Sequence, residues 1–184
     1  METILQTLKE ISKIVPTNEL NTSLQNFCCK DKDVEAFLKT KAIEFDLRNK
    51  SRTYLILEKE SSAKGILKIL AYFTLSLKIL EFGSGISKSL IKDIDGFSKN
   101  VNSIAVMLIG QFGKDEIFAK GIGGSIFLET CLGIIGKVQN FIGGRIVLVE
   151  CLPEEKITSF YSKSGFKFLQ HDKNDKYEQM IKLL

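Results

Sequence analysis

A glycine-rich turn in the second half of the chain has the composition of a phosphate-binding loop. It reads Lys-Gly-Ile-Gly-Gly-Ser over residues 120–125 and opens an apolar stretch with helical character. Glycines allow a ligand close to the backbone, and the first turn of a helix offers unpaired N–H groups and the positive end of the helix dipole. The turn therefore suits a diphosphate, with Lys120 and Ser125 adding side-chain contacts. The alternative is a flexible glycine turn that binds nothing.

A second short pattern lies further along the chain, where a predicted helix ends in Phe160-Tyr161 and is followed by Gly165-Phe166. Residues 118–123 fit the loop pattern Gln/Arg-x-x-Gly-x-Gly/Ala, except that Phe118 stands at its first position. Together the two patterns resemble the GNAT family of acetyl-CoA-dependent N-acyltransferases. On this resemblance, the diphosphate bound by the turn is that of coenzyme A.

The front half of the chain is similar to the GNAT subgroup that includes toxins of toxin-antitoxin pairs. The similar segments are Phe27-Cys28-Cys29, the run Ser51–Leu55 and the run Ala71–Leu75. The resemblance therefore extends over residues 24–183, which is nearly the whole chain.

The resemblance implies an α/β fold, a single-domain mixed and mostly antiparallel sheet flanked by helices, which is the GNAT-like acyl-CoA N-acyltransferase fold. It also implies that residues 1–184 form one domain, with an N-terminal helical extension at residues 1–20 and an acetyltransferase core at residues 24–183. Acetyl-CoA is the implied co-substrate, and direct acetyl transfer requires no metal. The residues expected to contact acetyl-CoA are Phe112, Gly113, Lys114, Lys120, Gly121, Ile122, Gly123, Gly124 and Ser125.

Tyr161 is the expected general acid. A phenol with a pKa of about 10 is protonated at neutral pH and can donate to the departing thiolate, and the tyrosine of this motif commonly has that role in the family. The alternative is a core aromatic like Phe160, with its hydroxyl bonded elsewhere. Glu150, at the end of a predicted strand, is the candidate acceptor of the amine proton, directly or through water. The favoured interpretation is a solvated strand-end carboxylate or a partner of the following helix start.

Composition fits one domain with a sizeable core, because the chain has 184 residues and is 44% hydrophobic. The net charge of +4 comes mostly from lysines and permits nucleic-acid contact without indicating it. Four cysteines without a Cys-x-x-Cys spacing, and a charged amphipathic start instead of a cleavable leader, favour a reducing cytoplasm. Lysines and a glutamate interrupt the most apolar windows, so no membrane span is expected.

Hydrophobic periodicity and turn residues predict the order of elements. The expected helices are Ile4–Val15, one capped by Asp31 or Asp33 that ends near Asn49, Lys88–Asp93, Gly123–Asn140, and one that starts at Pro153. The expected strands are Thr53–Leu57 and Ile66–Leu77 as a hairpin, Ser103–Gln111, Arg145–Glu150, and the terminal pair Phe166–Gln170 and Tyr177–Leu183. The strand Arg145–Glu150 is apolar on both faces, which predicts a central position.

A thiol-based mechanism is not favoured. Cys151 is interpreted as a small buried hydrophobe, because free cysteines usually pack in cores and the only histidine, His171, lies in another predicted strand. The spacing of Cys28, Cys29, Cys131 and Cys151 fits no zinc motif.

The acceptor of the acetyl group is left open between a small-molecule or peptide amine and an aminoacyl-tRNA. A basic cluster before the first predicted strand would suit a tRNA backbone, but the solvated face of an amphipathic helix explains it more simply. Its members are Lys39, Lys41, Arg48, Lys50 and Arg52. The tRNA alternative implies a toxin with an antitoxin partner, and analogy with the family suggests a homodimer. A non-catalytic acyl-CoA-binding or interaction module is the third alternative, motivated by Phe118.

Overall fold

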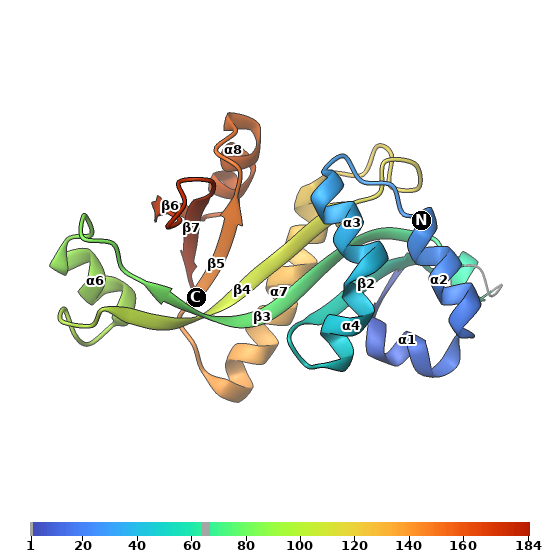
Figure 1. Ribbon diagram of the computed structural model, residues 1–184, viewed down its shortest axis with the longest axis horizontal. Helices are drawn as coiled ribbons and strands as arrows, with labels where there is room; N and C mark the ends of the chain where they lie inside the picture. The colour runs from blue at the N-terminus through green and yellow to red at the C-terminus, as the bar shows by residue number, and fades with distance from the viewer. Residues whose placement is uncertain (1, 64–66) are drawn as a thin grey trace. The chain divides into compact units, whose positions relative to one another are not determined.

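The computed structural model describes residues 2–63 and 67–184, and these form fifteen helices and strands (Figure 1). The chain divides into two compact units, Met1–Ser76 with Gln111–Leu128, and Leu77–Gly110 with Glu129–Leu184. Three elements run through both units, namely β3 (Ile69–Glu81), β4 (Ser103–Lys114) and α7 (Gly124–Ile142).

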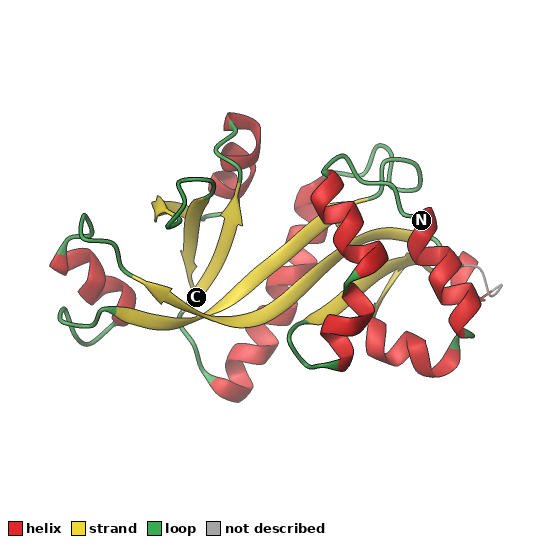
Figure 2. Cartoon of the chain, in the orientation of Figure 1, coloured by secondary structure: helices red, strands yellow, loops and turns green. Residues whose placement is uncertain are grey.

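Within the described residues, seven strands form one sheet in the order β1-β2-β3-β4-β5-β7-β6. Figure 2 shows the strands in yellow and the helices in red. β4 and β5 are parallel, whereas β1–β2, β2–β3, β5–β7 and β6–β7 are antiparallel. Helices flank the sheet, so the predicted mixed, mostly antiparallel α/β fold is confirmed.

The first unit carries the N-terminal elements. They are β1 (Thr3–Thr7), α1 (Leu8–Ile14), α2 (Thr17–Asn26), α3 (Lys32–Thr40), α4 (Ala42–Leu47), β2 (Arg52–Glu58) and α5 (Lys59–Ala63). Their core is formed by apolar side chains of the helices and of β2 and β3, including Leu8, Ile11, Leu24, Phe27, Leu38, Leu55 and Tyr72. The predicted hairpin of two strands is confirmed as β2 and β3, although Ile66, its expected first residue in β3, lies outside the described residues.

The predicted helix Ile4–Val15 is wrong in its first half. Thr7 and Glu10 form a capping box, in which the Thr7 hydroxyl accepts from the Glu10 N–H and the Glu10 carboxylate accepts from the Thr7 N–H, so the helix begins at Leu8. The residues before it pair with β2 as strand β1. The long predicted helix from Asp31 is likewise two helices, because it breaks at Lys41, although Asp31 is the cap of α3 as expected.

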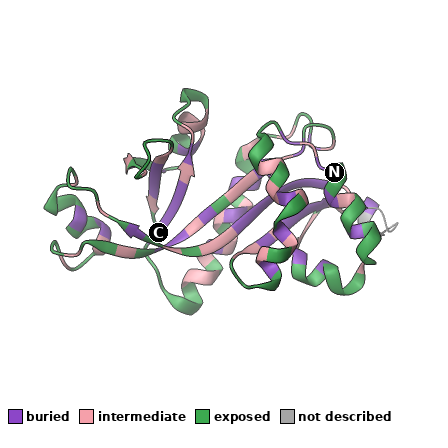
Figure 3. Cartoon of the chain, viewed as in Figure 1, coloured by how far each residue is buried: buried purple, intermediate pink, exposed green. Residues whose placement is uncertain are grey.

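The second unit contains α6 (Lys88–Asp95), β5 (Ile146–Cys151), α8 (Glu155–Lys163), β6 (Lys167–His171) and β7 (Glu178–Leu183). The predicted central strand is confirmed, because β5 lies between β4 and β7 and residues 146–149 are at most 1% exposed (Figure 3). The terminal strand pair is confirmed as β6 and β7. None of the helices in the described ranges is long and apolar enough to span a membrane.

Candidate active site

The end of β4 is packed tightly against the N-terminal part of the first unit. A Cβ added at Gly113 would lie 2.7 Å from Val34 Cγ1 and 3.3 Å from Cys29 Sγ, so only glycine fits there without rearrangement. The contact gives Gly113 a packing role beside its predicted contact with the cofactor. Phe112, the residue before it, is half-buried.

Lys114, the last residue of β4, stabilises the glycine turn with a hydrogen bond to its backbone. Its ammonium donates a hydrogen bond to the Ile122 carbonyl at 2.8 Å, which joins the end of β4 to the residue before the double glycine. The Ile122 N–H donates to the Ala119 carbonyl at 3.1 Å, and Ala119 is fully buried. The turn is therefore an ordered loop, which argues against the purely flexible alternative.

The predicted phosphate-binding residues lie on the surface of this loop. Gly121 has a φ of +84°, the left-handed region that favours glycine, and a Cβ there would meet no atom within 4 Å. Position 121 therefore favours glycine because of its backbone conformation, since there is space for a larger side chain. Gly123 and Ser125 are exposed on either side of Gly124, where α7 begins, so the first-turn N–H groups face no intrahelical acceptor.

Tyr161 lies on α8 inside an aromatic and thiol environment. It is 8% exposed. Its ring packs edge-on against the rings of Phe160 and Phe166, with ring centroids 5.1 Å and 5.6 Å apart. Burial raises the pKa of the phenol above its usual value, with smaller contributions from the nearby Cys151 and Cys131. A phenol in this environment is protonated at neutral pH.

The Tyr161 hydroxyl forms no hydrogen bond with any residue in the described ranges. Gly165 and Phe166 of the sequence motif explain the position of the ring. Gly165 has a φ of +86° just after α8, and a Cβ there would lie 2.7 Å from the Lys182 ammonium, which donates to the Ser164 carbonyl. This turn directs Phe166 into the core beside Tyr161.

Glu150 is part of a polar network on the second unit and is not a freely solvated carboxylate. Both of its oxygens accept from the Lys78 ammonium, and Oε1 also accepts from Gln179, its cross-strand neighbour on β7. Gln179 in turn accepts from Gln170 on β6. The sequence pattern does not reveal Lys78, because it lies 72 residues from Glu150 along the chain.

Three of the five members of the basic cluster before β2 form ion pairs within the first unit. Lys39 bonds Glu35, Arg48 bonds Glu44, and Arg52 bonds Asp46. Lys50 lies over the Phe45 ring. These pairs favour the solvated-face interpretation of the cluster over a dedicated tRNA-binding patch.

The cysteine and histidine positions do not form a nucleophilic pair. Cys151 on β5 and His171 on β6 both align with Glu178 of the intervening strand β7, so their backbones are about 10 Å apart. Burial raises the pKa of the Cys151 thiol to about 11, with Glu178 adding to the shift, and this keeps the thiol protonated.

No protein-family model matches the chain. The sheet order, with parallel β4 and β5 connected through α7, is the GNAT fold, and the chain has the fold of GNAT-type toxin acetyltransferases.

Three solved structures illustrate the likeness. A tyrosine-to-phenylalanine mutant of the AtaT toxin, bound to the C-terminus of the antitoxin AtaR and acetyl-CoA, has a TM-score of 0.71 at 17% identity and covers 100% of this chain and 94% of that chain. AtaT complexed with acetyl-methionyl-tRNA has a TM-score of 0.71 at 20% identity, with 96% and 94% covered. A tyrosine-to-phenylalanine mutant of KacT has a TM-score of 0.74 at 18% identity, with 100% and 95% covered. At these identities the likeness establishes the fold.

Proposed function

We propose that this protein is an N-acetyltransferase that moves an acetyl group from acetyl-CoA to a primary amine by direct attack. The observation that carries the proposal is the similarity of the whole chain to the AtaT toxin bound to acetyl-CoA, at a TM-score of 0.71. The acetyltransferase core, residues 24–183, belongs in this proposal to one domain that draws on both compact units.

The glycine turn is the proposed site of the coenzyme A diphosphate. The exposed positions Lys120, Gly121, Gly123 and Ser125, together with the start of α7, support this role because they combine accessible backbone, a cation and a helix N-terminus. Phe112, Gly113 and Lys114 at the end of β4 lead into the turn and are proposed to lie along the pantetheine arm. Gly124 contributes its backbone N–H group, and Ile122, whose own N–H is bonded to the Ala119 carbonyl, lines the turn.

In the proposed reaction, the nitrogen of a neutral amine forms a bond with the thioester carbonyl carbon and the carbon–sulfur bond breaks. Tyr161 donates its proton to the leaving thiolate. This role is supported by its buried, protonated phenol and by a hydroxyl without a hydrogen bond to the described part of the chain. Glu150 accepts the proton released by the amine, directly or through water. The half-buried position of Glu150 and its fixed orientation on Lys78 support this role.

The acceptor favoured by the comparisons is the α-amino group of an aminoacyl-tRNA, which is itself a primary amine. AtaT is known in complex with acetyl-methionyl-tRNA and with its antitoxin AtaR. We therefore propose that this protein is a toxin with an antitoxin partner, and that it forms a homodimer as GNAT proteins often do. A small-molecule or peptide amine is the competing acceptor.

The test combines calorimetry with acetyl-CoA and an assay of thiol release with small amines, peptides and charged tRNA. Thiol release only with charged tRNA would support the toxin. Thiol release with other amines would support the general acetyltransferase. Binding without release would point to a non-catalytic acyl-CoA-binding module, and absence of binding would overturn the proposal.

A further inference from the structure

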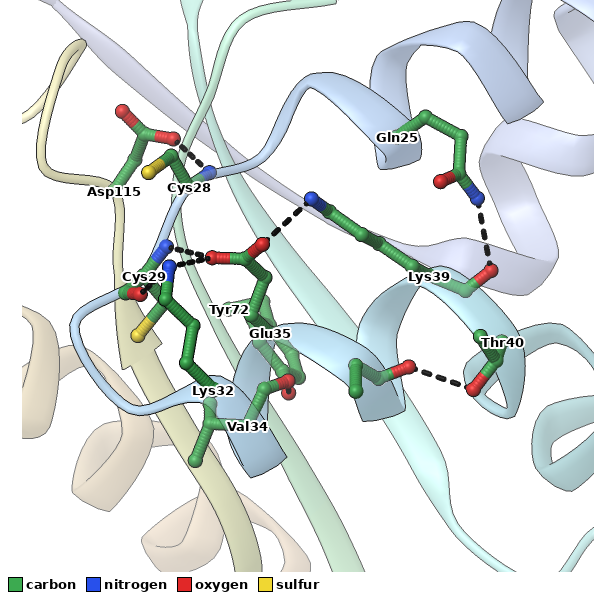
Figure 4. Close-up of polar contacts among 11 residues, drawn as sticks. Gln25, Cys28, Cys29, Lys32, Val34, Glu35, Lys39, Thr40, Tyr72 and Asp115 are labelled. Atoms are coloured by element: carbon green, nitrogen blue, oxygen red, sulfur yellow. Dashed lines mark hydrogen bonds and ion pairs between the residues drawn. The ribbon is translucent and has the colours of Figure 1, made fainter.

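Asp115, the first residue after β4, has a fully buried side chain that accepts three backbone hydrogen bonds. Its Oδ1 accepts from the N–H groups of Ile117 and Phe118, at 2.8 and 2.6 Å. Its Oδ2 accepts from the Cys28 N–H at 2.8 Å (Figure 4). One carboxylate therefore joins residues 117 and 118, which lead into the glycine turn, to a segment 87 residues earlier in the chain. The glycine loop comprises residues 115–125.

The backbone strengthens the same connection. Asp115 pairs with Cys29 as an antiparallel bridge, and the Glu116 N–H donates to the Cys28 carbonyl at 2.8 Å. The close approach of Gly113 to Val34 and Cys29 leaves no space between the two segments. The end of β4 is thus packed directly against residues 28–34.

The 28–35 segment is held on its other side as well. Glu35 accepts from the Cys29 N–H at 2.9 Å and from the ammonium groups of Lys32 and Lys39, and the Tyr72 hydroxyl donates to the Val34 carbonyl (Figure 4). The backbone at Cys28 and Cys29 is therefore bonded both to Asp115 and to Glu35 in the first turn of α3. Hydrogen bonds thus run from residues 117 and 118 through Asp115 and the Cys28–Cys29 backbone to Glu35.

We propose that Asp115 is a positioning residue that couples the glycine loop to the segment Cys28–Glu35, so that coenzyme A binding at the loop stabilises the start of α3. This role rests on the proposed function, because it requires the loop to hold the diphosphate. Asp115 does not contact the reacting atoms. It fixes the loop by orienting the N–H groups of residues 117 and 118 inward and by anchoring them to Cys28.

The two oxygens of Asp115 allow the coupling to be broken selectively. In Asp115→Asn, the remaining carbonyl oxygen can still accept from residues 117 and 118, whereas the new NH₂ group faces the Cys28 N–H and cannot accept from it. The variant thus keeps the loop turn and loses the connection to Cys28. The matched control is Glu116→Gln, which makes the same change of charge at an exposed neighbouring side chain.

Calorimetry with acetyl-CoA and steady-state kinetics on the full chain test the role. Asp115→Asn is expected to weaken acetyl-CoA binding about tenfold and to raise the KM for acetyl-CoA while kcat changes less than about twofold. Glu116→Gln is expected to match the wild type. Equal affinity of wild type and Asp115→Asn would overturn the coupling, whereas failure of the wild type itself to bind would overturn the proposed function and the coupling together.

Amide hydrogen exchange on the wild type tests the coupling between the glycine loop and the segment Cys28–Glu35 even where Asp115→Asn does not fold. Addition of coenzyme A is expected to slow amide exchange at residues 117–126 and also at Cys28 and Cys29. Slowed exchange confined to residues 117–126 would overturn the coupling while leaving the diphosphate site in place.

Discussion

Lys78 and Glu150 form a bidentate ion pair, in which both carboxylate oxygens lie 2.6 Å from the lysine ammonium nitrogen. The glutamate side chain is 22% exposed and is further fixed by Gln179 at 2.7 Å. A carboxylate held in this way has one orientation, which suits a group that must accept a proton at a defined place.

Replacing that carboxylate should slow acetyl transfer. Glu150→Gln keeps the size of the side chain and its bond with Gln179 but removes the proton acceptor, so kcat is expected to fall by roughly a hundredfold or more. The measurement is thiol release at saturating acetyl-CoA. Glu129→Gln, at an exposed position on α7, is the control, and wild-type kcat in Glu150→Gln would remove Glu150 from the mechanism.

Loss of the Tyr161 hydroxyl should separate binding from turnover. Tyr161→Phe preserves the aromatic contacts with Phe160 and Phe166, so the fold and the affinity for acetyl-CoA are expected to be unchanged. The rate of thiol release is expected to drop by about 10² to 10⁴, as for other general acids. Tyr177→Phe serves as the control, and unchanged turnover in Tyr161→Phe would show that the acid lies elsewhere.

The raised pKa of Tyr161 also predicts the shape of the pH profile. Burial keeps the phenol protonated, so the acid form is lost only when the pH rises beyond the ordinary tyrosine value of about 10. The kcat of the wild type is therefore expected to show no descending limb from this group up to about pH 10. A descending limb near pH 8 that disappears in Tyr161→Phe would contradict the effect of burial.

A methyl group on the glycine loop should impair coenzyme A binding without unfolding the protein. A Cβ at Gly123 would meet only the Ser125 hydroxyl at 3.5 Å, so Gly123→Ala has space in the free protein. Its methyl group would occupy the surface proposed to receive the diphosphate, and affinity measured by calorimetry is expected to fall at least about tenfold.

The control for this loop is Gly133→Ala in the middle of α7, where a Cβ meets no atom within 4 Å. Alanine is expected to stabilise the helix there by about 0.5–1 kcal/mol and to leave the affinity unchanged. Wild-type affinity in Gly123→Ala would place the diphosphate away from the loop.

Protonation of the Glu35 carboxylate at low pH should destabilise the start of α3. Hydrogen bonds from Lys39, Lys32 and the Cys29 N–H lower the pKa of the carboxyl from 4.5 to about 2. Because the pKa is depressed in the folded state, the stabilisation is complete above about pH 4.5 and is lost as the pH falls toward 2.

Glu35→Gln should therefore lower the melting temperature at pH 7 and narrow its difference from the wild type as the pH falls from 4.5 toward 2. Glu44→Gln removes an exposed helical ion pair instead and is the comparison. A constant difference between wild type and Glu35→Gln across this range would show that the carboxylate charge contributes nothing to stability.

Several parts of the fold are encoded locally and could be predicted. Asp31 caps α3 because its side chain reaches the N–H groups two and three residues later, and the apolar run at residues 146–149 has to be buried on both faces. The glycines at 121 and 165 mark turns with positive φ. Each of these depends on neighbours within a few residues, so the sequence alone determined the order of most elements and the positions of both motifs.

Strand β1 and the partners of the candidate site were decided by tertiary structure. Residues 3–7 fit a helical stripe as well as a strand, and the capping box at Thr7 together with the edge of β2 selected the strand. Asp115 meets Cys28 across 87 residues, and Glu150 meets Lys78 across 72. Such pairs follow from sheet register and close packing, which bring together groups whose spacing along the chain carries no signal.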